Sequence, residues 1–425
     1  MKMLRWLQIA AATAAVALSV GIANADAQDF TIAVVPDTQN YSDVTLPQPR
    51  GEATFIQQMQ YLADQKDQKN IVFVSFVGDL IQHGDGQFRI APKDGAPGPH
   101  TVMDTRGEWD IANRAVSILS RADVPFGMVP GNHDYDNYSW WSDDGGPGAS
   151  RPLSGGRAWN LYFGPASRHF AGKAWYGGAS DNGLNSFQTF QGDGKTFLHL
   201  SLEMDPPVSA LIWAQTVLDA HPGLPVIVTT HEWLAPSKTG ETKRGDSTAN
   251  LFAGTDHLSP DQVWDRFIRK NPMIFMVLSG HAYLPAVDGV SLGENLRIDT
   301  NDAGHPVYQV LQDYQGNTVG PDGQAGSANG GGGWLRFIAF DTARRKMHFY
   351  TYSPLQDRYA GKDGEQTFGV AAHYSDFELD FPPQLLDRDK PPTAPTTRTS
   401  RLQNTATWTV TLELLLQPQQ FLAFR

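Results

Sequence analysis

A short apolar strand, a polar loop and a helix follow one another repeatedly in the first third of the chain, and this order leaves few folds open. Segments 30–35, 71–77 and 124–129 are short and apolar, and segments 51–65 and 108–121 between them carry apolar residues at helical spacing. Strands that alternate with helices predict parallel strand pairs in a sheet that is covered by helices. In such sheets, binding and catalytic sites lie beyond the carboxyl ends of the strands.

The remainder of the chain continues this pattern and then departs from it. Further strands are predicted over 186–190, 196–202, 225–230 and 273–278, with helices over 208–220 and 260–270. In the last third, no helices separate the predicted strands, which are 307–314, 334–341 and 346–353. They predict a second, antiparallel sheet. The predicted fold class is therefore α/β, with two sheets.

The first 25 residues have the features of a secretory signal peptide. Lys2 and Arg5 precede an apolar run over 9–22, and Ala23-Asn24-Ala25 is a typical cleavage pattern. The run is too short for a comfortable transmembrane helix, and no later stretch is long and apolar enough to span a bilayer. The sequence therefore predicts a secreted or periplasmic protein, with an uncleaved N-terminal anchor as the alternative.

Composition excludes several kinds of site. The chain of 425 residues contains no cysteine, so disulfides, thiolate metal ligands and thiol catalysis are ruled out. Any metal must be bound by imidazole or by oxygen ligands. A formal net charge of -12 is not the positive surface expected of a nucleic-acid binder. We therefore expect a small substrate and no nucleic-acid partner.

The main domain is predicted over 28–385, and two segments differ from its pattern. Segment 135–183 is loop-like and unusually aromatic, and residues 386–425 form a Pro/Thr-rich linker with a short tail. The aromatic segment is either a wall for an organic leaving group or a small packed subdomain, and the second interpretation is favoured because aromatic clusters usually form cores. Under the first interpretation, the side chains that reach a phosphate would be Arg151, Arg157 or Arg168.

Polar clusters follow five of the predicted strands. They are Asp37-Thr38-Gln39, Gly78-Asp79, Gly131-Asn132-His133-Asp134, His231 and Gly280-His281-Ala282-Tyr283. A single Asp or His after a strand is most often a turn residue, but their conjunction at five strand ends is specific. Carboxylates, imidazoles and amide oxygens together suit Mn²⁺, Fe or Zn²⁺. Asp79 has the character of a bridging carboxylate, because two cations about 4 Å apart repel without an anion between them.

These clusters resemble the pattern of the calcineurin-like metallophosphoesterase family, which is D-x-H, G-D, G-N-H-D/E, H and G-H-x-H, and the resemblance extends over about 30–353. It implies a four-layer αββα sandwich of two mixed sheets flanked by helices, with two divalent or mixed-valence metal ions (Mn, Fe or Zn). It further implies that Asp79 bridges the metals and that Asp37 belongs to the first site. The second site would be completed by Asn132, His231 and His281.

The same resemblance implies two catalytic residues. His133 would lie near the scissile phosphate and donate a proton to the leaving oxygen or stabilise charge on the phosphoryl group. Asp134 would orient His133 by a hydrogen bond. The chain departs from the family pattern at Gln39 and Tyr283, which stand where the family has histidines. Both positions belong to the first metal site, where they supply an amide oxygen and a phenol as candidate ligands.

The expected function is hydrolysis of a small phosphomonoester or phosphodiester outside the cytoplasm by metal-activated hydroxide. One alternative is a catalytically impaired binding protein with a degenerate first metal site. Another is a structural surface protein that is attached through its tail. Two further histidines have non-catalytic interpretations: His83 either lines the mouth of the site or lies in a surface loop, and His199 is a core residue with satisfied hydrogen bonds.

Overall fold

The structure is a computed structural model that describes residues 28–45, 51–90, 101–138, 152–287, 290–316, 331–361 and 374–386. The predicted signal peptide, Arg151 and the linker and tail beyond residue 386 lie outside the described residues. Within the described ranges, no helix has the length and apolar character needed to cross a membrane.

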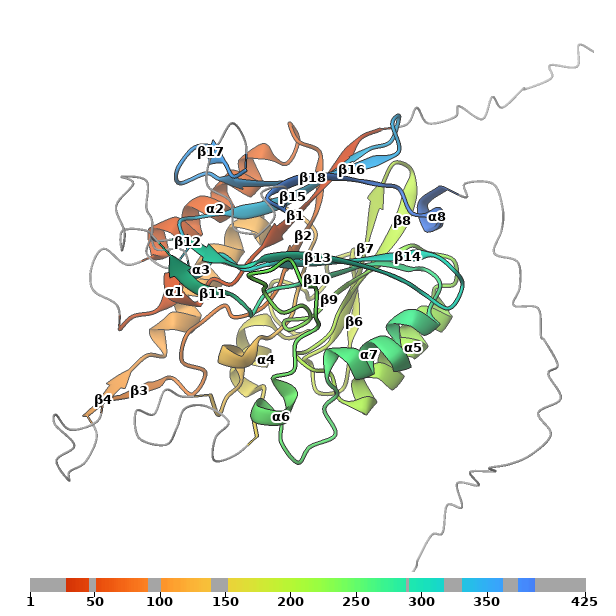
Figure 1. The fold of residues 1–425 in the computed structure, drawn as a ribbon. Helices are drawn as coiled ribbons and strands as arrows, with labels where there is room; N and C mark the ends of the chain where they lie inside the picture. The colour runs from red at the N-terminus through yellow and green to blue at the C-terminus, as the bar shows by residue number, and fades with distance from the viewer. Residues whose placement is uncertain are drawn as a thin grey trace, which may run out of the picture. The chain divides into compact units, whose positions relative to one another are not determined.

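Two seven-stranded mixed sheets form the centre of the fold (Figure 1). The first contains β1 (Phe30–Val35), β2 (Ile71–Phe76), β5 (Phe126–Met128), β15 (Leu335–Asp341), β16 (Lys346–Ser353), β17 (Arg358–Tyr359) and β18 (Asp376–Asp380). Its strand order is β17-β16-β15-β1-β2-β5, with β18 paired to β16. The strands β1, β2 and β5 are parallel, and β15 runs antiparallel to β1.

The second sheet has the order β13-β14-β10-β9-β8-β7-β6. Its strands are β6 (Tyr176–Ala179), β7 (Ser186–Gly192), β8 (Lys195–Ser201), β9 (Val226–Thr229), β10 (Ile274–Ser279), β13 (Glu294–Thr300) and β14 (Pro306–Gln312). The strands β8, β9, β10 and β14 are parallel to one another. Two small hairpins lie outside both sheets: β3 (Gln87–Ile90) with β4 (Thr101–Asp104), and β11 (Leu284–Val287) with β12 (Val290–Leu292).

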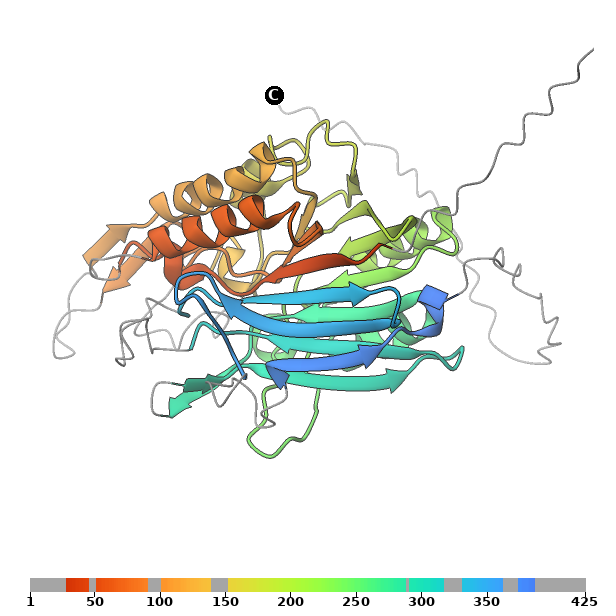
Figure 2. The same cartoon turned by 90° about the horizontal axis from the view of Figure 1, so that it is seen from above.

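Helices cover the outer faces of the two sheets (Figures 1 and 2). The described helices are α1 (Gln39–Ser42), α2 (Glu52–Gln65), α3 (Gly107–Arg121), α4 (Arg157–Phe163), α5 (Val208–Ala220), α6 (Thr248–Leu251), α7 (Pro260–Arg266) and α8 (Pro383–Leu386), with short 3-10 turns at Asn132–Asp134 and Ile268–Lys270. Apolar residues of α2 and α3 pack on the first sheet, and those of α5 and α7 pack on the second. The four-layer αββα sandwich is therefore confirmed.

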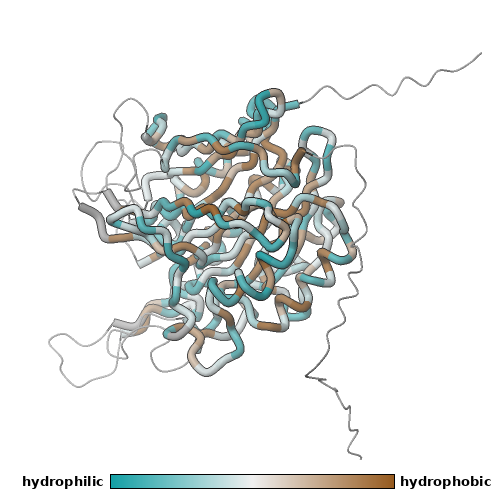
Figure 3. The backbone as a smooth tube through the Cα atoms, turned by 45° about the vertical axis from the view of Figure 1, so that its right-hand side comes forward, coloured by the Kyte–Doolittle hydropathy of each residue, from teal (hydrophilic) through white to brown (hydrophobic). Residues whose placement is uncertain are grey.

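The alternation of side chains along β1 shows how the layers are specified. Ile32 and Val34 point toward the second sheet and join the apolar cluster between the sheets, whereas Ala33 and Val35 join the cluster beneath α2 and α3. All four side chains are fully buried, so β1 is apolar on both faces, as a central parallel strand requires. Figure 3 shows that the hydrophobic stretches run along such strands in the interior.

The prediction that the last third forms a separate antiparallel sheet is wrong. The strand β14 pairs in parallel with β10 and belongs to the second sheet, while β15 and β16 belong to the first. A strand's own residues specify that it is buried but not which distant strand it pairs with, and this explains the error. As a consequence, the carboxyl end of β14 lies beside that of β10.

The aromatic segment is a packed part of the core rather than a wall of exposed rings. Trp159 and Phe163 of α4 and Phe170 are buried in the same cluster as α3 and β5. Arg168 donates hydrogen bonds to Asn113 and Ser117 on α3. These contacts agree with the packed-subdomain interpretation for the described residues of this segment, which stays a prediction.

A buried ion pair joins the two sheets. Glu294 at the start of β13 accepts a hydrogen bond from Arg336 on β15, and both side chains are completely buried. The Glu294 carboxylate also accepts hydrogen bonds from the hydroxyls of Tyr314, Thr351 and Ser375, at 2.8, 3.0 and 2.6 Å. This network satisfies a charge that would otherwise be very unfavourable in the interior.

His199 is the core residue that the sequence predicts. It is fully buried on β8, where Nδ1 lies 3.0 Å from Gln188 Oε1 and Nε2 lies 3.0 Å from Ser75 Oγ and 2.9 Å from Thr229 Oγ1. Nδ1 donates to the amide oxygen and Nε2 accepts from a hydroxyl, while the two hydroxyls lie 2.8 Å apart and hydrogen-bond each other, so both nitrogens of the neutral ring have partners. Burial lowers the pKa of His199 to about 3.

We expect His199 to make folding less stable in acid. Between pH 6.5 and pH 3 the unfolded chain binds a proton on His199 that the native protein does not, so stability falls as the pH falls. The expected contribution is a loss of roughly 2 kcal/mol in the free energy of unfolding between pH 7 and pH 5. Urea unfolding of the wild type and of His199→Gln at both pH values measures it. An equal change in the two proteins would contradict the prediction.

Candidate metal centre

The carboxyl ends of five strands, three from the first sheet and two from the second, meet at one edge of the sandwich. In the first sheet, Asp37 follows β1, Asp79 follows β2 and Asn132 follows β5. In the second sheet, His231 follows β9 and His281 follows β10. Backbone hydrogen bonds join the loops within each sheet, from the Thr38 N–H to the Asp79 carbonyl and from the Gly280 N–H to the His231 carbonyl, both at 2.9 Å.

Four potential ligand atoms converge where the second metal was predicted. Nε2 of His231 lies 3.2 Å from Oδ2 of Asp79, 3.1 Å from Oδ1 of Asn132 and 3.1 Å from Nδ1 of His281. Adjacent ligand atoms around a cation with bonds of about 2.1 Å are roughly 3.0–3.4 Å apart. The spacing of this second-site group therefore fits a metal ion, and Asp79, His231 and His281 form one of the described groups with metal-ligand geometry.

Backbone geometry explains why the glycines of these motifs are needed. A Cβ on Gly131 would lie 2.1 Å from Oδ1 of Asp79, and a Cβ on Gly280 would lie 2.2 Å from Oδ2 of Asp37. Asp79 and His281 have φ angles of 52° and 73°, a left-handed conformation that is unfavourable for residues with a Cβ. Such strain is tolerated where function requires it, and here it points both side chains into the cluster.

The first predicted site is formed by Asp37, Gln39 and Asp79. Oδ1 of Asp37 accepts the His281 N–H at 2.9 Å, whereas Oδ2 of Asp37 and Oε1 of Gln39 are buried without a hydrogen-bond partner among the described residues. Nε2 of Gln39 lies 3.2 Å from Oδ2 of Asp79. Oδ2 of Asp79 thus lies between the two groups, where a bridging carboxylate would lie. That it binds two cations stays a prediction.

Tyr283 is the predicted ligand with the weakest structural support. Its side chain is 41% exposed, and no hydrogen bond connects it to the cluster among the described contacts. Burial, Asp313 and Asp37 raise the pKa of Tyr283, which places the phenol in the field of the first site and keeps it protonated at neutral pH. Its role as a ligand stays a prediction.

Two residues of this edge were missed by sequence reasoning. Asp313 and Gln315 follow β14, which was assigned to the wrong sheet. Asp313 is fully buried, and Gln315 accepts a hydrogen bond from Nε2 of Gln39. The predicted strand 307–314 included Asp313, whereas β14 ends at Gln312, so the sequence did not mark this pair as a cluster that follows a strand.

The electrostatics of the cluster are dominated by burial and mutual charge. Burial and the charge of Asp313 raise the pKa of Asp37 well above its usual value. Burial would also raise the pKa of Asp79, but His231 and His133 outweigh it, so that this pKa is lowered. Burial opposes protonation of His231, yet Asp79 raises its pKa to about 10. Buried carboxylates that rely on an imidazolium for compensation are the environment that a divalent cation would stabilise.

The donor set therefore fits metal ions. Carboxylates, imidazoles and an amide oxygen converge, two buried oxygens lack hydrogen-bond partners among the described residues, and glycines leave the space that the ligands need. Nδ1 of His231 lies 2.8 Å from the Val77 carbonyl, a contact that fixes the ring and leaves Nε2 for the cluster.

Comparison with known proteins agrees with this geometry. A family model described as calcineurin-like phosphoesterase matches residues 30–284, more than half of the chain. The chain belongs to the calcineurin-like phosphoesterase family of hydrolases. The Bacillus subtilis protein YvnB is 27% identical over 361 residues, which cover 84% of this chain and 22% of YvnB. The chain thus spans about a fifth of the length of this relative.

Solved structures with similar chains are more distant. One is GAP50, described as the anchor in the inner membrane complex of Plasmodium, with 14% identity and a TM-score of 0.36 over 83% of this chain and 89% of that chain. Another is a dimetal phosphatase from Danio rerio, with 14% identity and a TM-score of 0.40 over 78% of this chain and 98% of that chain.

In this family member, His133 lies beside the candidate metal centre. Its backbone N–H donates to Oδ1 of Asp79 at 3.0 Å, and its Nε2 lies 3.9 Å from Oδ2 of Asp79. Nδ1 donates to the Gln82 carbonyl at 2.8 Å, so in the neutral ring Nε2 accepts from the hydroxyl of Tyr138 at 3.0 Å. Burial lowers the pKa of His133 despite the nearby Asp79.

The expectation that Asp134 orients His133 by a direct hydrogen bond is wrong. Among the described residues, the Asp134 carboxylate accepts the N–H groups of Leu80, Ile81 and Gly131, at 2.9, 3.2 and 2.9 Å. A carboxylate that accepts three backbone donors fixes loops rather than a ring. Asp134 therefore joins the loop after β2 to the loop after β5 and positions His133 through the backbone.

His83 has neither of the two roles that its sequence allowed. It is buried, and Nδ1 lies 2.9 Å from Oε1 of Glu108 on α3, whose Oε2 accepts the N–H groups of Gln82 and His83 at 3.1 and 2.8 Å. Glu108 thus fixes the segment that contains Gln82, whose carbonyl accepts the hydrogen bond from Nδ1 of His133. The group formed by Asp43, His83 and Glu108 also has metal-ligand spacing, but Glu108 already accepts these hydrogen bonds.

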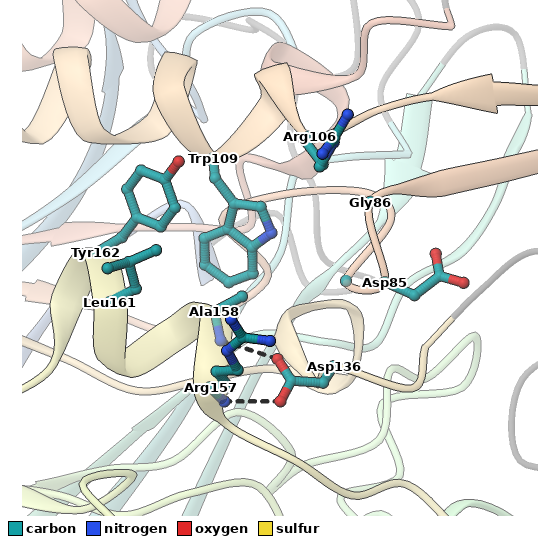
Figure 4. Close-up of a pocket in the computed structure, with 10 residues that line it drawn as sticks. Asp85, Gly86, Arg106, Trp109, Asp136, Arg157, Ala158, Leu161 and Tyr162 are labelled. Carbon is teal, nitrogen blue, oxygen red and sulfur yellow. Dashed lines mark hydrogen bonds between the residues drawn. The ribbon is translucent and has the colours of Figure 1, made fainter.

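A surface pocket of about 410 Å³ lies next to this segment (Figure 4). Trp109 and Tyr162 line one side, and Arg157 lies beside Asp136, whose carboxylate accepts the backbone N–H groups of Arg157 and Ala158 at 2.7 and 2.9 Å. None of the residues that line the pocket belongs to the metal centre. The suggestion that Arg157 reaches a bound phosphate therefore gains no support from the described contacts.

Tyr138 is expected to tune the proton affinity of His133. Its hydroxyl donates to Nε2 and stabilises the neutral ring, so Tyr138→Phe is expected to raise the His133 pKa. If His133 acts as a proton donor, the alkaline limb of the pH profile of kcat/KM moves to higher pH. Tyr162→Phe, whose hydroxyl donates to Asp110 at 3.0 Å, is the control. An unchanged profile in Tyr138→Phe would argue against this role.

Proposed function

We infer that this phosphoesterase hydrolyses a small phosphomonoester or phosphodiester and that it does so outside the cytoplasm. The observation that carries the inference is the convergence of Asp79, Asn132, His231 and His281 on one point, with His133 directly beside it. Export is proposed from the signal peptide pattern of residues 1–25. A small substrate agrees with the net charge of -12.

The residues that would hold the cations divide between two sites. Asp37, Gln39 and Asp79 would hold the first, and Asp79, Asn132, His231 and His281 the second. Bound cations would supply Lewis acidity, which lowers the pKa of water and draws charge from phosphoryl oxygens.

The protein's own contribution is position and proton transfer. Asp134 and Glu108 fix the two segments that support His133, one through backbone N–H groups and the other through the Gln82 and His83 backbone. Nδ1 of His133 is held by the Gln82 carbonyl, so Nε2 is the atom that exchanges a proton with a leaving oxygen. Because burial lowers the pKa of His133, its protonated ring is a stronger acid than an exposed imidazolium.

Hydrolysis by purified mature protein tests the function. We expect turnover of p-nitrophenyl phosphate or of bis-p-nitrophenyl phosphate after loading with Mn²⁺, Fe or Zn²⁺, and the ratio of kcat/KM for the two substrates identifies the bond type. His133→Ala is expected to lower kcat by about a hundredfold or more while the bound metal remains. Full metal loading without turnover of either substrate at any pH would favour the binding-protein alternative.

Export is tested separately. Residues 1–25 are fused to a reporter that is active only outside the cytoplasm, and the fraction of processed fusion is measured. Processing and reporter activity are expected, and both should be lost when a charged residue interrupts the apolar run over 9–22. An unprocessed fusion that remains with the membrane would instead favour the N-terminal anchor.

A further inference from the structure

The proposed first metal site lacks the imidazoles that the family pattern supplies, yet it contains buried oxygen atoms without hydrogen-bond partners in the part of the chain that the structure describes. Oδ2 of Asp37 and Oε1 of Gln39 belong to side chains that are 2% and 1% exposed, and neither atom has a hydrogen-bond partner among the described residues. Buried polar atoms without partners are rare in folded proteins. Both atoms are oxygens, and both come from the loop after β1.

Asp313 and Gln315 approach the same place from the second sheet. Nε2 of Gln39 contacts both Oδ2 of Asp79, at 3.2 Å, and Oε1 of Gln315, and Nε2 of Gln315 donates to Oδ2 of Asp313 at 3.0 Å. The two amides therefore connect the carboxylates of Asp79 and Asp313 through consecutive contacts. The backbone N–H of Gln315 donates to the other Asp313 oxygen at 2.9 Å.

The Asp313 carboxylate keeps capacity for another partner. Each of its oxygens accepts one hydrogen bond from Gln315, and a carboxylate oxygen has two lone pairs. Hydrogen bonds that hold a carboxylate in place while leaving lone pairs available are typical of metal ligands. The parallel pairing of β14 with β10 brings Asp313 to the end of the sheet at which His281 lies.

The charges also require compensation. Asp37, Asp79 and Asp313 are 2%, 1% and 0% exposed, and the ion pairs described for them are with His231 and His133 alone, with no lysine or arginine. Burial raises the pKa of Asp37, Asp313 and Asp79 both raise it further, and three buried carboxylates that interact in this way are very unfavourable without added positive charge. A divalent cation among them would provide it.

We propose that Asp313 is a ligand of the first metal and that Gln315 holds Gln39 in that site, so that this site binds its cation through oxygen atoms alone. The proposal rests on the two-metal centre of the proposed function. Carboxylate and amide oxygens favour hard cations such as Mn²⁺ and Mg²⁺, whereas the imidazoles of His231 and His281 suit Zn²⁺ or Fe. Both sites can therefore bind Mn²⁺, but they differ in their relative affinity for Zn²⁺ and Fe.

Metal counting on the full mature protein tests the proposal without any assay of activity. Protein stripped with a chelator is titrated with Mn²⁺, and bound metal is counted by mass spectrometry. We expect two equivalents in the wild type and, in Asp313→Asn, one retained equivalent and an affinity for the other that is at least tenfold weaker. His281→Ala removes a ligand of the second site. The one equivalent of Mn²⁺ that this variant still binds is expected to occupy the first site and to depend on Asp313.

Thermal unfolding gives a second readout and a check on folding. Without metal, Asp313→Asn is expected to be at least as stable as the wild type, because one of three buried carboxylate charges has been removed. Added Mn²⁺ is expected to raise Tm less in this variant than in the wild type. Asp302→Asn is the matched control, because Asp302 lies at the other end of the β13–β14 hairpin and pairs with Arg269 and Lys270.

Two equivalents bound by Asp313→Asn with wild-type affinity would overturn the proposal. The proposal would also be overturned if the wild type bound a single equivalent of Mn²⁺ that Asp313→Asn still bound and His281→Ala did not. Failure of the proposed function is distinguishable: binding that depends on Asp313 without turnover would keep the metal site and reject the hydrolase. Turnover together with metal binding that does not depend on Asp313 would keep the hydrolase function and reject Asp313 as a metal ligand.

Discussion

Asp79→Asn is expected to lower kcat/KM for phosphoester hydrolysis by about a thousandfold or more and to remove at least one equivalent of metal. Oδ2 of Asp79 lies 3.2 Å from both Nε2 of Gln39 and Nε2 of His231, between the two proposed sites. A neutral amide there cannot offset the repulsion between two cations, and charge stabilisation by the metals supplies several kcal/mol of transition-state binding. Steady-state kinetics and elemental analysis of the same samples measure both effects.

Asp256→Asn is the control for this prediction because Asp256 is exposed and distant in sequence from every proposed ligand. It is expected to retain wild-type metal content and kcat/KM. Circular dichroism of Asp79→Asn separates loss of the site from loss of the fold. A folded Asp79→Asn protein with two equivalents of metal and near wild-type turnover would show that Asp79 does not bridge the cations.

Arg336→Met is expected to reduce the free energy of unfolding by about 3–5 kcal/mol, because it leaves the buried carboxylate of Glu294 without its cationic partner. The double variant Arg336→Met/Glu294→Gln removes both charges and should recover much of this loss. The glutamine oxygen can still accept from the hydroxyls of Tyr314 and Thr351. Urea denaturation of the wild type, the single variant and the double variant gives the coupling free energy.

A loss below about 1 kcal/mol in Arg336→Met would mean that water or a change in protonation compensates Glu294. Equal losses in the single and double variants would mean that packing of the Arg336 side chain, rather than its charge, is the important contribution. Because Tyr314 lies between Asp313 and Gln315, a reduced Mn²⁺ affinity in the single variant would show that this ion pair also supports the first metal site.

Much of the fold was predictable because local sequence patterns specify many of its strands and helices. The strand 30–35 is apolar on both faces, and a central parallel strand requires that pattern. Helices 51–65 and 108–121 were visible from their spacing, and α2 and α3 lie there. The strand β13 was missed because Arg297 and Asp299 interrupt its apolar character, and its stability comes from pairing with β14.

The residues of the candidate site were also predictable only in part. The clusters after 30–35, 71–77 and 273–278 were found because a polar residue follows a clear strand and the family letters are present. Asp313 and Gln315 were missed because no family letter marks them and because the partner of β14 is a long-range property of the fold. The assignment of Asp134 to the His133 ring was wrong because sequence adjacency says nothing of where a side chain points.

The proposed ligands come from both sheets, and this has a consequence for the lifetime of the protein. A cation bound at this edge cross-links the two layers, so the free energy of metal binding also resists their separation. Without metal, buried negative charges repel across the interface, and the loops that carry them are expected to open before the rest of the sandwich. Proteases cut where chains open, so the supply of metal would determine how long a molecule survives as well as how fast it works.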